Sequence, residues 1–145
     1  MENEFINFQE GELLGVAKSI LDLLTSPKIT LLEGQMGAGK TNLVRHLAQW
    51  LGADQEVSSP SFSVINEYRC KENPWGILQF IHMDLYRLKN LEEAHQAGVF
   101  EYLNGDHTVL IEWPEMLLPL LSELPIMRIQ FEVLDNQARS LKLTF

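Results

Sequence analysis

The first half of the chain alternates between helical and strand-like spacing of its apolar residues. Over residues 10–25 the apolar side chains recur at helical spacing, which predicts an amphipathic helix that Ser26-Pro27 ends. The short apolar run 28–33 is bounded by glycine and is typical of a buried strand. Helical spacing returns over residues 43–51, and Gly52 is placed to end that second helix in a left-handed conformation.

The middle of the chain is predicted to form a hairpin and then a helix. Two strand-like runs, 62–70 and 76–84, flank a polar turn and predict an antiparallel pair. Asn90, closely followed by two glutamates, is typical of a helix start. An asparagine side chain can cap the first turn, and acidic side chains favour the positive end of the helix dipole.

The last part of the chain is predicted to complete a sheet. Residues 107–112 are a further candidate for a buried strand, and 116–123 for a short helix. Residues 127–133 and 141–145 alternate apolar and polar side chains around a polar turn, which predicts a half-exposed terminal β-hairpin. We find no internal repeat, so residues 1–145 are expected to form one α/β domain with a mixed parallel and antiparallel sheet.

Composition and charge narrow the class of protein. The 145 residues include 11 Lys and Arg against 20 Asp and Glu, a net charge of −9, which argues against stable DNA binding and against holding RNA unaided. The lone Cys70 forms no internal disulfide, and the acidic start lacks the features of a secretory signal. No apolar stretch approaches the ~20 residues needed to cross a bilayer. We therefore expect a cytoplasmic protein with no membrane association.

One motif points directly to chemistry. Residues 34–41 read GQMGAGKT and match the phosphate-binding loop pattern G-x-x-x-x-G-K-[ST] at every fixed position, between a predicted strand and a predicted helix. Glycines let backbone N–H groups turn toward a β-phosphate, and the helix start presents its positive dipole end. Lys40 can then reach the β- and γ-phosphates, while the Thr41 hydroxyl lies where Mg²⁺ binds. The sequence predicts a nucleoside triphosphate site in a three-layer, P-loop NTPase-like domain.

Two acids and a serine-rich turn are candidates to complete this site. A phosphate loop usually works with an acidic residue at the end of a neighbouring strand, and both Glu112 and Asp84 end apolar runs. The residues alone leave open which carboxylate contacts Mg²⁺. The hydroxyls around Pro60, among them Ser61, are placed to contact a γ-phosphate or the metal. His82 is interpreted as a packed core residue rather than a proton carrier.

Four motifs, read together and in order, resemble the bacterial TsaE family. They are GAGKT at 37–41, SPSF at 59–62, HMDLYR at 82–87 and IEWPE at 111–115. The resemblance extends from the first predicted helix to the terminal hairpin. It implies a weak ATPase with ATP and Mg²⁺ as ligands, required for forming the threonylcarbamoyl group on adenosine 37 of tRNAs.

The resemblance also implies roles for residues matched by position. Lys40 would bind phosphate, Thr41 and Glu112 would hold Mg²⁺, and Asp84 would be a Walker-B-like acid that binds the metal or orients water. Ser61 stands where the family usually has threonine, and Trp113 would belong to the functional surface. The residues expected to contact nucleotide are Gly37, Ala38, Gly39, Lys40, Thr41, Asn42, Phe8 and Asn136. Asn42 stands where the family usually has threonine, and Phe8 and Asn136 would lie beside adenine.

The resemblance implies partners similar to TsaD and TsaB, with tRNA reached only indirectly through them. The negative charge fits this, because an acidic surface can meet a more basic partner. Two alternatives remain. One is a small P-loop metabolite kinase, although the chain lacks the arginine-rich lid such enzymes use. The other is a non-hydrolytic module in which nucleotide orders the Ser59-Pro60-Ser61 segment for docking.

Overall fold

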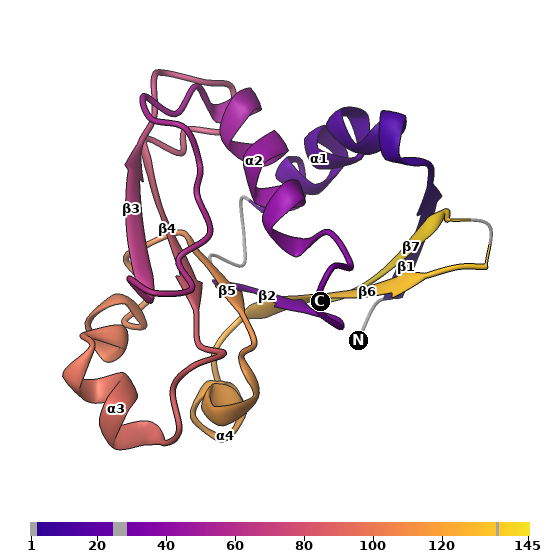
Figure 1. Ribbon diagram of the computed structural model, residues 1–145. Helices are drawn as coiled ribbons and strands as arrows, with labels where there is room; N and C mark the ends of the chain where they lie inside the picture. The colour runs from indigo at the N-terminus through magenta and orange to yellow at the C-terminus, as the bar shows by residue number, and fades with distance from the viewer. Residues whose placement is uncertain (1–2, 25–28, 136) are drawn as a thin grey trace.

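The described residues form a seven-stranded sheet with helices on both faces (Figure 1). The computed structural model describes residues 3–24, 29–135 and 137–145. The strands lie in the order β1-β7-β6-β2-β5-β4-β3. Their bounds are β1 (Asn3–Phe8), β2 (Ile29–Glu33), β3 (Ile65–Arg69), β4 (Gln79–Asp84), β5 (Val109–Glu112), β6 (Ile126–Val133) and β7 (Arg139–Thr144).

The sheet is parallel at its centre and antiparallel at both sides. β2 pairs in parallel with β5 and β6, and β4 pairs in parallel with β5. β3 is antiparallel to β4, β7 to β6, and β1 to β7. The mixed sheet is therefore confirmed. The carboxyl ends of β2, β4 and β5 meet at one edge, which is where open α/β sheets place their ligands.

Helices cover both faces and make the domain three-layered. They are α1 (Leu13–Leu21), α2 (Lys40–Leu51), α3 (Leu91–Gln96) and α4 (Leu118–Leu121), with 3₁₀ helices at Glu10–Glu12, Val99–Tyr102 and Glu115–Leu117. Leu32 and Leu110 pack in one core with α1 and α2, whereas Leu31 and Ile111 pack in a second core with α3 and α4. Burial on both faces explains why β2 and β5 read as continuous apolar runs.

The structure confirms most predicted elements and shortens several. Both predicted hairpins form, and the Asn90 side chain caps α3 by accepting from the Glu93 backbone N–H at 2.9 Å. Gly52 ends α2 with φ 71°. The helix predicted over 10–25 begins as a 3₁₀ turn and ends as α-helix at Leu21; its predicted end at Ser26-Pro27 lies outside the described residues.

The sequence pattern does not predict β1, because residues 3–8 show no clear alternation of apolar and polar side chains. It lies at the sheet edge, where Phe8 is its one buried residue and Phe5 is 66% exposed. Backbone pairing with β7 holds it, from Asn3 opposite Thr144 to Phe8 opposite Arg139. In the part of the chain that the structure describes, no helix has the length and apolar character to span a membrane.

Candidate nucleotide and metal site

The loop 34–39 joins β2 to α2 at the edge where the parallel strands end. Gly34 has φ 150°, and a Cβ there would lie 2.9 Å from the Phe131 Cβ, so a larger residue would clash. Gly39 has φ 108° and precedes the first turn of α2 in a left-handed conformation. Glycine is therefore required both for close packing and for the turn that points the α2 N–H groups at the loop.

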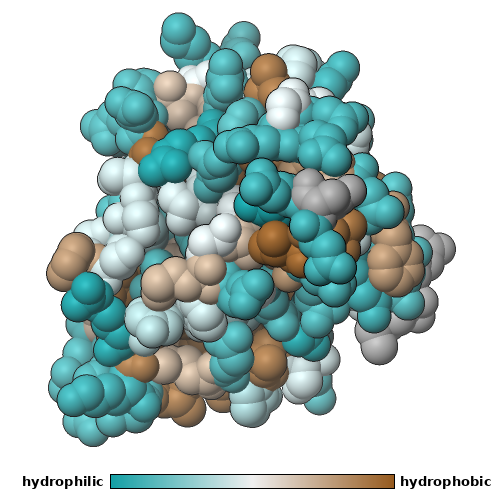
Figure 2. All heavy atoms as spheres, turned by 45° about the vertical axis from the view of Figure 1, so that its right-hand side comes forward, coloured by the Kyte–Doolittle hydropathy of each residue, from teal (hydrophilic) through white to brown (hydrophobic). Residues whose placement is uncertain are grey.

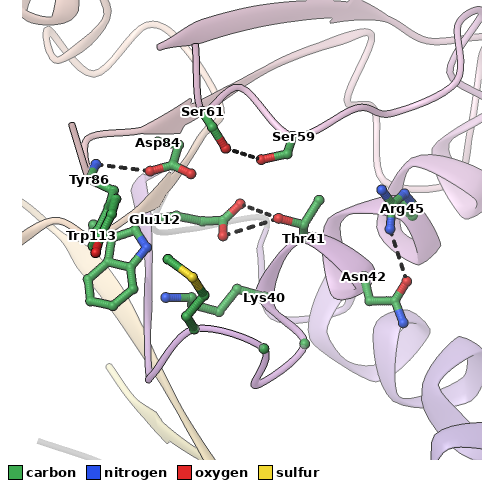
Figure 3. Close-up of a pocket in the computed structure, with 13 residues that line it drawn as sticks. Lys40, Thr41, Asn42, Arg45, Ser59, Ser61, Asp84, Tyr86, Glu112 and Trp113 are labelled. Carbon is green, nitrogen blue, oxygen red and sulfur yellow. Dashed lines mark hydrogen bonds between the residues drawn. The ribbon is translucent and has the colours of Figure 1, made fainter. Parts of the chain in front are cut away.

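A cavity of about 410 Å³ opens over this loop (Figure 3). It collects side chains from the loop, from α2, from the serine-rich segment and from the ends of β4 and β5. The residues predicted for the site that line it are Gly37, Gly39, Lys40, Thr41, Asn42, Ser61, Asp84, Glu112 and Trp113. The fold thus brings together positions that are up to 76 residues apart, from Gly37 to Trp113.

The Glu112 carboxylate is held by two side chains, Thr41 and His82, at the base of the cavity. The Thr41 hydroxyl lies 2.9 Å from Oε2 and 3.2 Å from Oε1 of Glu112, and can donate to the carboxylate. His82 Nε2 lies 2.6 Å from the same Oε2. Glu112 is 3% exposed and His82 is fully buried. The carboxylate therefore points at the start of α2 from a fixed position.

Asp84 stands beside Glu112, because the two residues face each other in the parallel register of β4 and β5. Its Oδ1 accepts from the Tyr86 backbone N–H at 2.9 Å. Burial raises the pKa of Asp84 above its ordinary value; the Tyr86 N–H opposes this rise, and the negative charge of Glu112 adds to it. A buried carboxyl with a raised pKa beside a second carboxylate is typical of a site that binds a cation or moves a proton.

Lys40, the first residue of α2, also lines the cavity and is 5% exposed. Its Nζ donates to the Gly34 carbonyl at 2.6 Å and lies 3.6 Å from the centre of a Trp113 ring. Burial lowers the pKa of Lys40, while the negative charges of Glu112, Asp84 and Glu115 oppose that shift. Trp113 has a left-handed backbone with φ 56°, and its ring contacts Tyr86 at 4.9 Å between centres. The ammonium thus rests on a carbonyl and an aromatic face.

The serine-rich segment lies across the cavity from the loop. Ser59 and Ser61 hydroxyls hydrogen-bond to each other at 2.7 Å, and both line the cavity. Arg45, which the sequence did not single out, donates from Nε to the Val57 carbonyl and from Nη1 to Asn42 Oδ1, both at 3.3 Å. Arg45 therefore links α2 to the start of this segment. Its position one helical turn after Thr41 is the signal that could have found it.

A second cavity of about 180 Å³ adjoins the loop on the β1 side. Phe8, Ala38, Asn42, Phe131 and Arg139 are among the residues that line it. Phe8 and Ala38, both predicted to contact nucleotide, lie here, whereas Asn136 lies outside the described residues. An aromatic and aliphatic wall beside a phosphate loop suits a nucleobase.

The donor set fits Mg²⁺. A hydroxyl and two carboxylates, from Thr41, Glu112 and Asp84, supply the hard oxygen ligands that Mg²⁺ prefers. Within the described residues no group of three or more His, Cys, Asp or Glu could hold a metal by itself.

Comparisons with known proteins agree on one family. A sequence model of the family described as threonylcarbamoyl adenosine biosynthesis protein TsaE matches residues 8–141. The tRNA threonylcarbamoyladenosine biosynthesis protein TsaE of Rickettsia conorii is 36% identical over 131 residues, 90% of this chain and 71% of that protein. The protein of the same name from Haemophilus influenzae is 37% identical over 128 residues, 88% of this chain and 77% of that protein. The crystal structure of Bacillus subtilis YdiB matches with a TM-score of 0.63 and 24% identity, covering 98% of this chain and 84% of that one, so the fold is shared.

Proposed function

This chain belongs to the TsaE family and has a role in tRNA threonylcarbamoyladenosine biosynthesis, and we propose that it serves there as a slow Mg²⁺-dependent ATPase. The observation that carries the proposal is the contact between the Thr41 hydroxyl and Glu112 beside a complete phosphate loop. A loop hydroxyl bonded to a strand-end carboxylate is the arrangement that P-loop NTPases use to hold their metal. Asp84 adds a second carboxylate at the same point.

Four groups at the cavity have proposed tasks in ATP hydrolysis: the loop N–H groups, Lys40, the Thr41–Glu112 pair and Asp84. Backbone N–H groups of the loop bind the β-phosphate, and the Lys40 ammonium exchanges the Gly34 carbonyl for phosphate oxygens. Thr41 and Glu112 would hold Mg²⁺, which would supply positive charge to the phosphates of the bound nucleotide. Because burial raises its pKa, the Asp84 carboxylate accepts a proton more readily than an ordinary aspartate, which suits it to orient the attacking water.

The Ser61 hydroxyl is the proposed contact to the γ-phosphate. It lies on the cavity wall opposite the loop and is bonded only to the neighbouring Ser59 hydroxyl among the interactions described for it. Both hydroxyls can turn toward an anion without breaking a helix or strand. Hydrolysis would remove that anion and release the segment, which gives a nucleotide-dependent change at the surface. Phe8 and the second cavity are proposed to take the adenine ring.

The partners proposed for this chain are proteins similar to TsaD and TsaB, in the cytoplasm, with tRNA contacted through them. A net charge of −9 would repel the tRNA backbone. On the face shown in Figure 2, hydrophilic residues predominate and apolar ones form small groups. Such a surface suits a reversible complex with a more basic protein better than a permanent one, because obligate interfaces are more hydrophobic.

The test is reconstitution of the modified nucleoside with the partner proteins and Lys40→Ala. We expect the variant to bind ATP poorly and to support no sustained product formation. Lys18→Ala is a matched control, because Lys18 is exposed and lies 5.6 Å from a Trp50 ring, away from the loop. Product formation by Lys40→Ala at the wild-type rate would contradict the proposal.

A non-hydrolysable ATP analogue separates hydrolysis from simple gating. We expect it to support no more than a single round of product formation, because the Ser59–Ser61 segment would not be released. Continued turnover with the analogue would identify a non-hydrolytic module. ADP production that depends on an added metabolite would identify a kinase.

A further inference from the structure

His82 is a buried polar residue that the proposed chemistry leaves without a task. It lies on β4 two residues before Asp84, so both side chains are on the same face of the strand. Its ring is fully buried, with Nε2 2.6 Å from Glu112 Oε2. Its other nitrogen, Nδ1, is buried and has no hydrogen-bond partner among the described residues. We infer that His82 is a positioning residue that fixes the Glu112 carboxylate for Mg²⁺-bound nucleotide.

The partners of the ring decide where its proton lies. A carboxylate oxygen can only accept, so Nε2 must carry the N–H that donates to Glu112. A buried N–H without a partner is costly, which favours leaving Nδ1 as an unprotonated lone pair. In this tautomer the His82 ring donates one hydrogen bond, from Nε2 to the Glu112 carboxylate.

Glu112 needs such a fixed donor because of its place in the chain. It is the last residue of β5, and the next residue, Trp113, turns into a left-handed conformation. The backbone pairing of β5 therefore ends at Glu112 and does not by itself fix the direction of the Glu112 side chain. Thr41 contacts both carboxylate oxygens, and its hydroxyl must turn when it binds a metal. With Oε2 held by His82, Oε1 stays directed at the cavity in both states.

The inference rests on the proposed nucleotide function and predicts a metal-specific defect. Hydrogen bonds that orient a ligating carboxylate typically change metal affinity by about 10- to 100-fold when removed. His82→Leu removes the donor and keeps an apolar side chain of moderate size in the buried site. His82→Gln places an amide N–H at the same number of bonds from Cβ as Nε2, so it can restore the contact.

The experiment is calorimetric titration of both variants with ADP, once with Mg²⁺ and once with a chelator. We expect His82→Leu to bind Mg²⁺-ADP at least about tenfold more weakly than wild type. Metal-free ADP should bind the two proteins equally, and His82→Gln should recover most of the loss. Equal weakening of both ligands in a folded His82→Leu protein would show a merely structural role and overturn the inference. Unchanged Mg²⁺-ADP affinity would overturn it as well.

A measurement on the wild-type protein covers the case in which His82→Leu does not fold. Nitrogen-15 NMR of the nucleotide-free protein at neutral pH should find the ring proton of His82 on Nε2. An unprotonated Nε2 would overturn the inference, because no donor would then face Glu112. A different result would contradict the proposed ATPase function instead. That result is a wild-type protein that carries the Nε2 proton but binds ADP no more tightly with Mg²⁺ than without it.

Discussion

Asp84→Asn should make the nucleotide-free protein more stable, although it removes a carboxylate proposed to act in ATP hydrolysis. The side chain is 6% exposed, and the amide keeps an oxygen that accepts from the Tyr86 N–H. What the substitution removes is a negative charge facing Glu112 in the parallel register. Side chains on facing residues of neighbouring strands lie about 5 Å apart. Two unit charges at that distance repel by roughly 3 kcal/mol at an effective dielectric constant of about 20.

The gain in the free energy of unfolding should be smaller than the Asp84–Glu112 repulsion energy, because the substitution also removes the attraction between Asp84 and the Lys40 ammonium. We expect Asp84→Asn to raise the free energy of unfolding by about 1 to 2 kcal/mol at neutral pH. For a domain of this size that is a rise in Tm of roughly 2 to 8 °C. Urea denaturation and thermal scans of the nucleotide-free protein measure it. Asp106→Asn, at an exposed loop position, is the matched control and should change little.

The stability difference between Asp84→Asn and wild type should depend on pH. The folded-state pKa of Asp84 is raised by burial, so its charge costs stability above that pKa and the cost disappears as the carboxyl takes a proton. The advantage of Asp84→Asn should therefore shrink as the pH falls through the raised pKa. An equal or lower stability of Asp84→Asn at neutral pH would refute the reasoning. So would an advantage that grows in acid.

Three further predictions concern the loop, a helix cap and the metal. Gly34→Ala should destabilise the fold by about 1 to 3 kcal/mol in urea denaturation, because its Cβ would lie 2.9 Å from that of Phe131; an unchanged midpoint would contradict this. Asn90→Ala should cost about 1 kcal/mol by removing the bond to the Glu93 N–H, and Asn90→Ser should recover most of it in the same assay. Chelation of Mg²⁺ should weaken ATP binding in calorimetry, because the Glu112 and Asp84 carboxylates that line the cavity would repel a triphosphate without its cation; equal affinity in a chelator would contradict it.

Local signals in the sequence were sufficient for the loop and for the elements that flank it. The glycine pattern at 34–41, the Gly52 helix end and the Asn90 cap each depend on neighbouring residues, and all three take the expected backbone form. The strand-end acids were found because an apolar run that ends in a carboxylate is visible without knowing the sheet. Their pairing in adjacent strands appears only in the structure.

Contacts between distant segments could not be predicted in the same way. The bond from His82 to Glu112 joins positions 30 residues apart and depends on β4 and β5 being neighbours in register. The sequence around His82 therefore could not predict Glu112 as its hydrogen-bond partner. β1 gave no sign either, because an edge strand held by backbone pairing needs no buried face. Residues 25–28 and 136, which include the predicted end of the first helix, lie outside the described chain.

The most direct test of the account is phosphate release from ATP by the purified chain, measured with Mg²⁺ and with a chelator, for wild type and Lys40→Ala. The ammonium of Lys40 and the Thr41–Glu112 pair should both be required for hydrolysis. We predict slow release by the wild-type protein that stops without Mg²⁺ and is lost in Lys40→Ala. Release that continues at the same rate in the chelator, or in Lys40→Ala, would contradict the account.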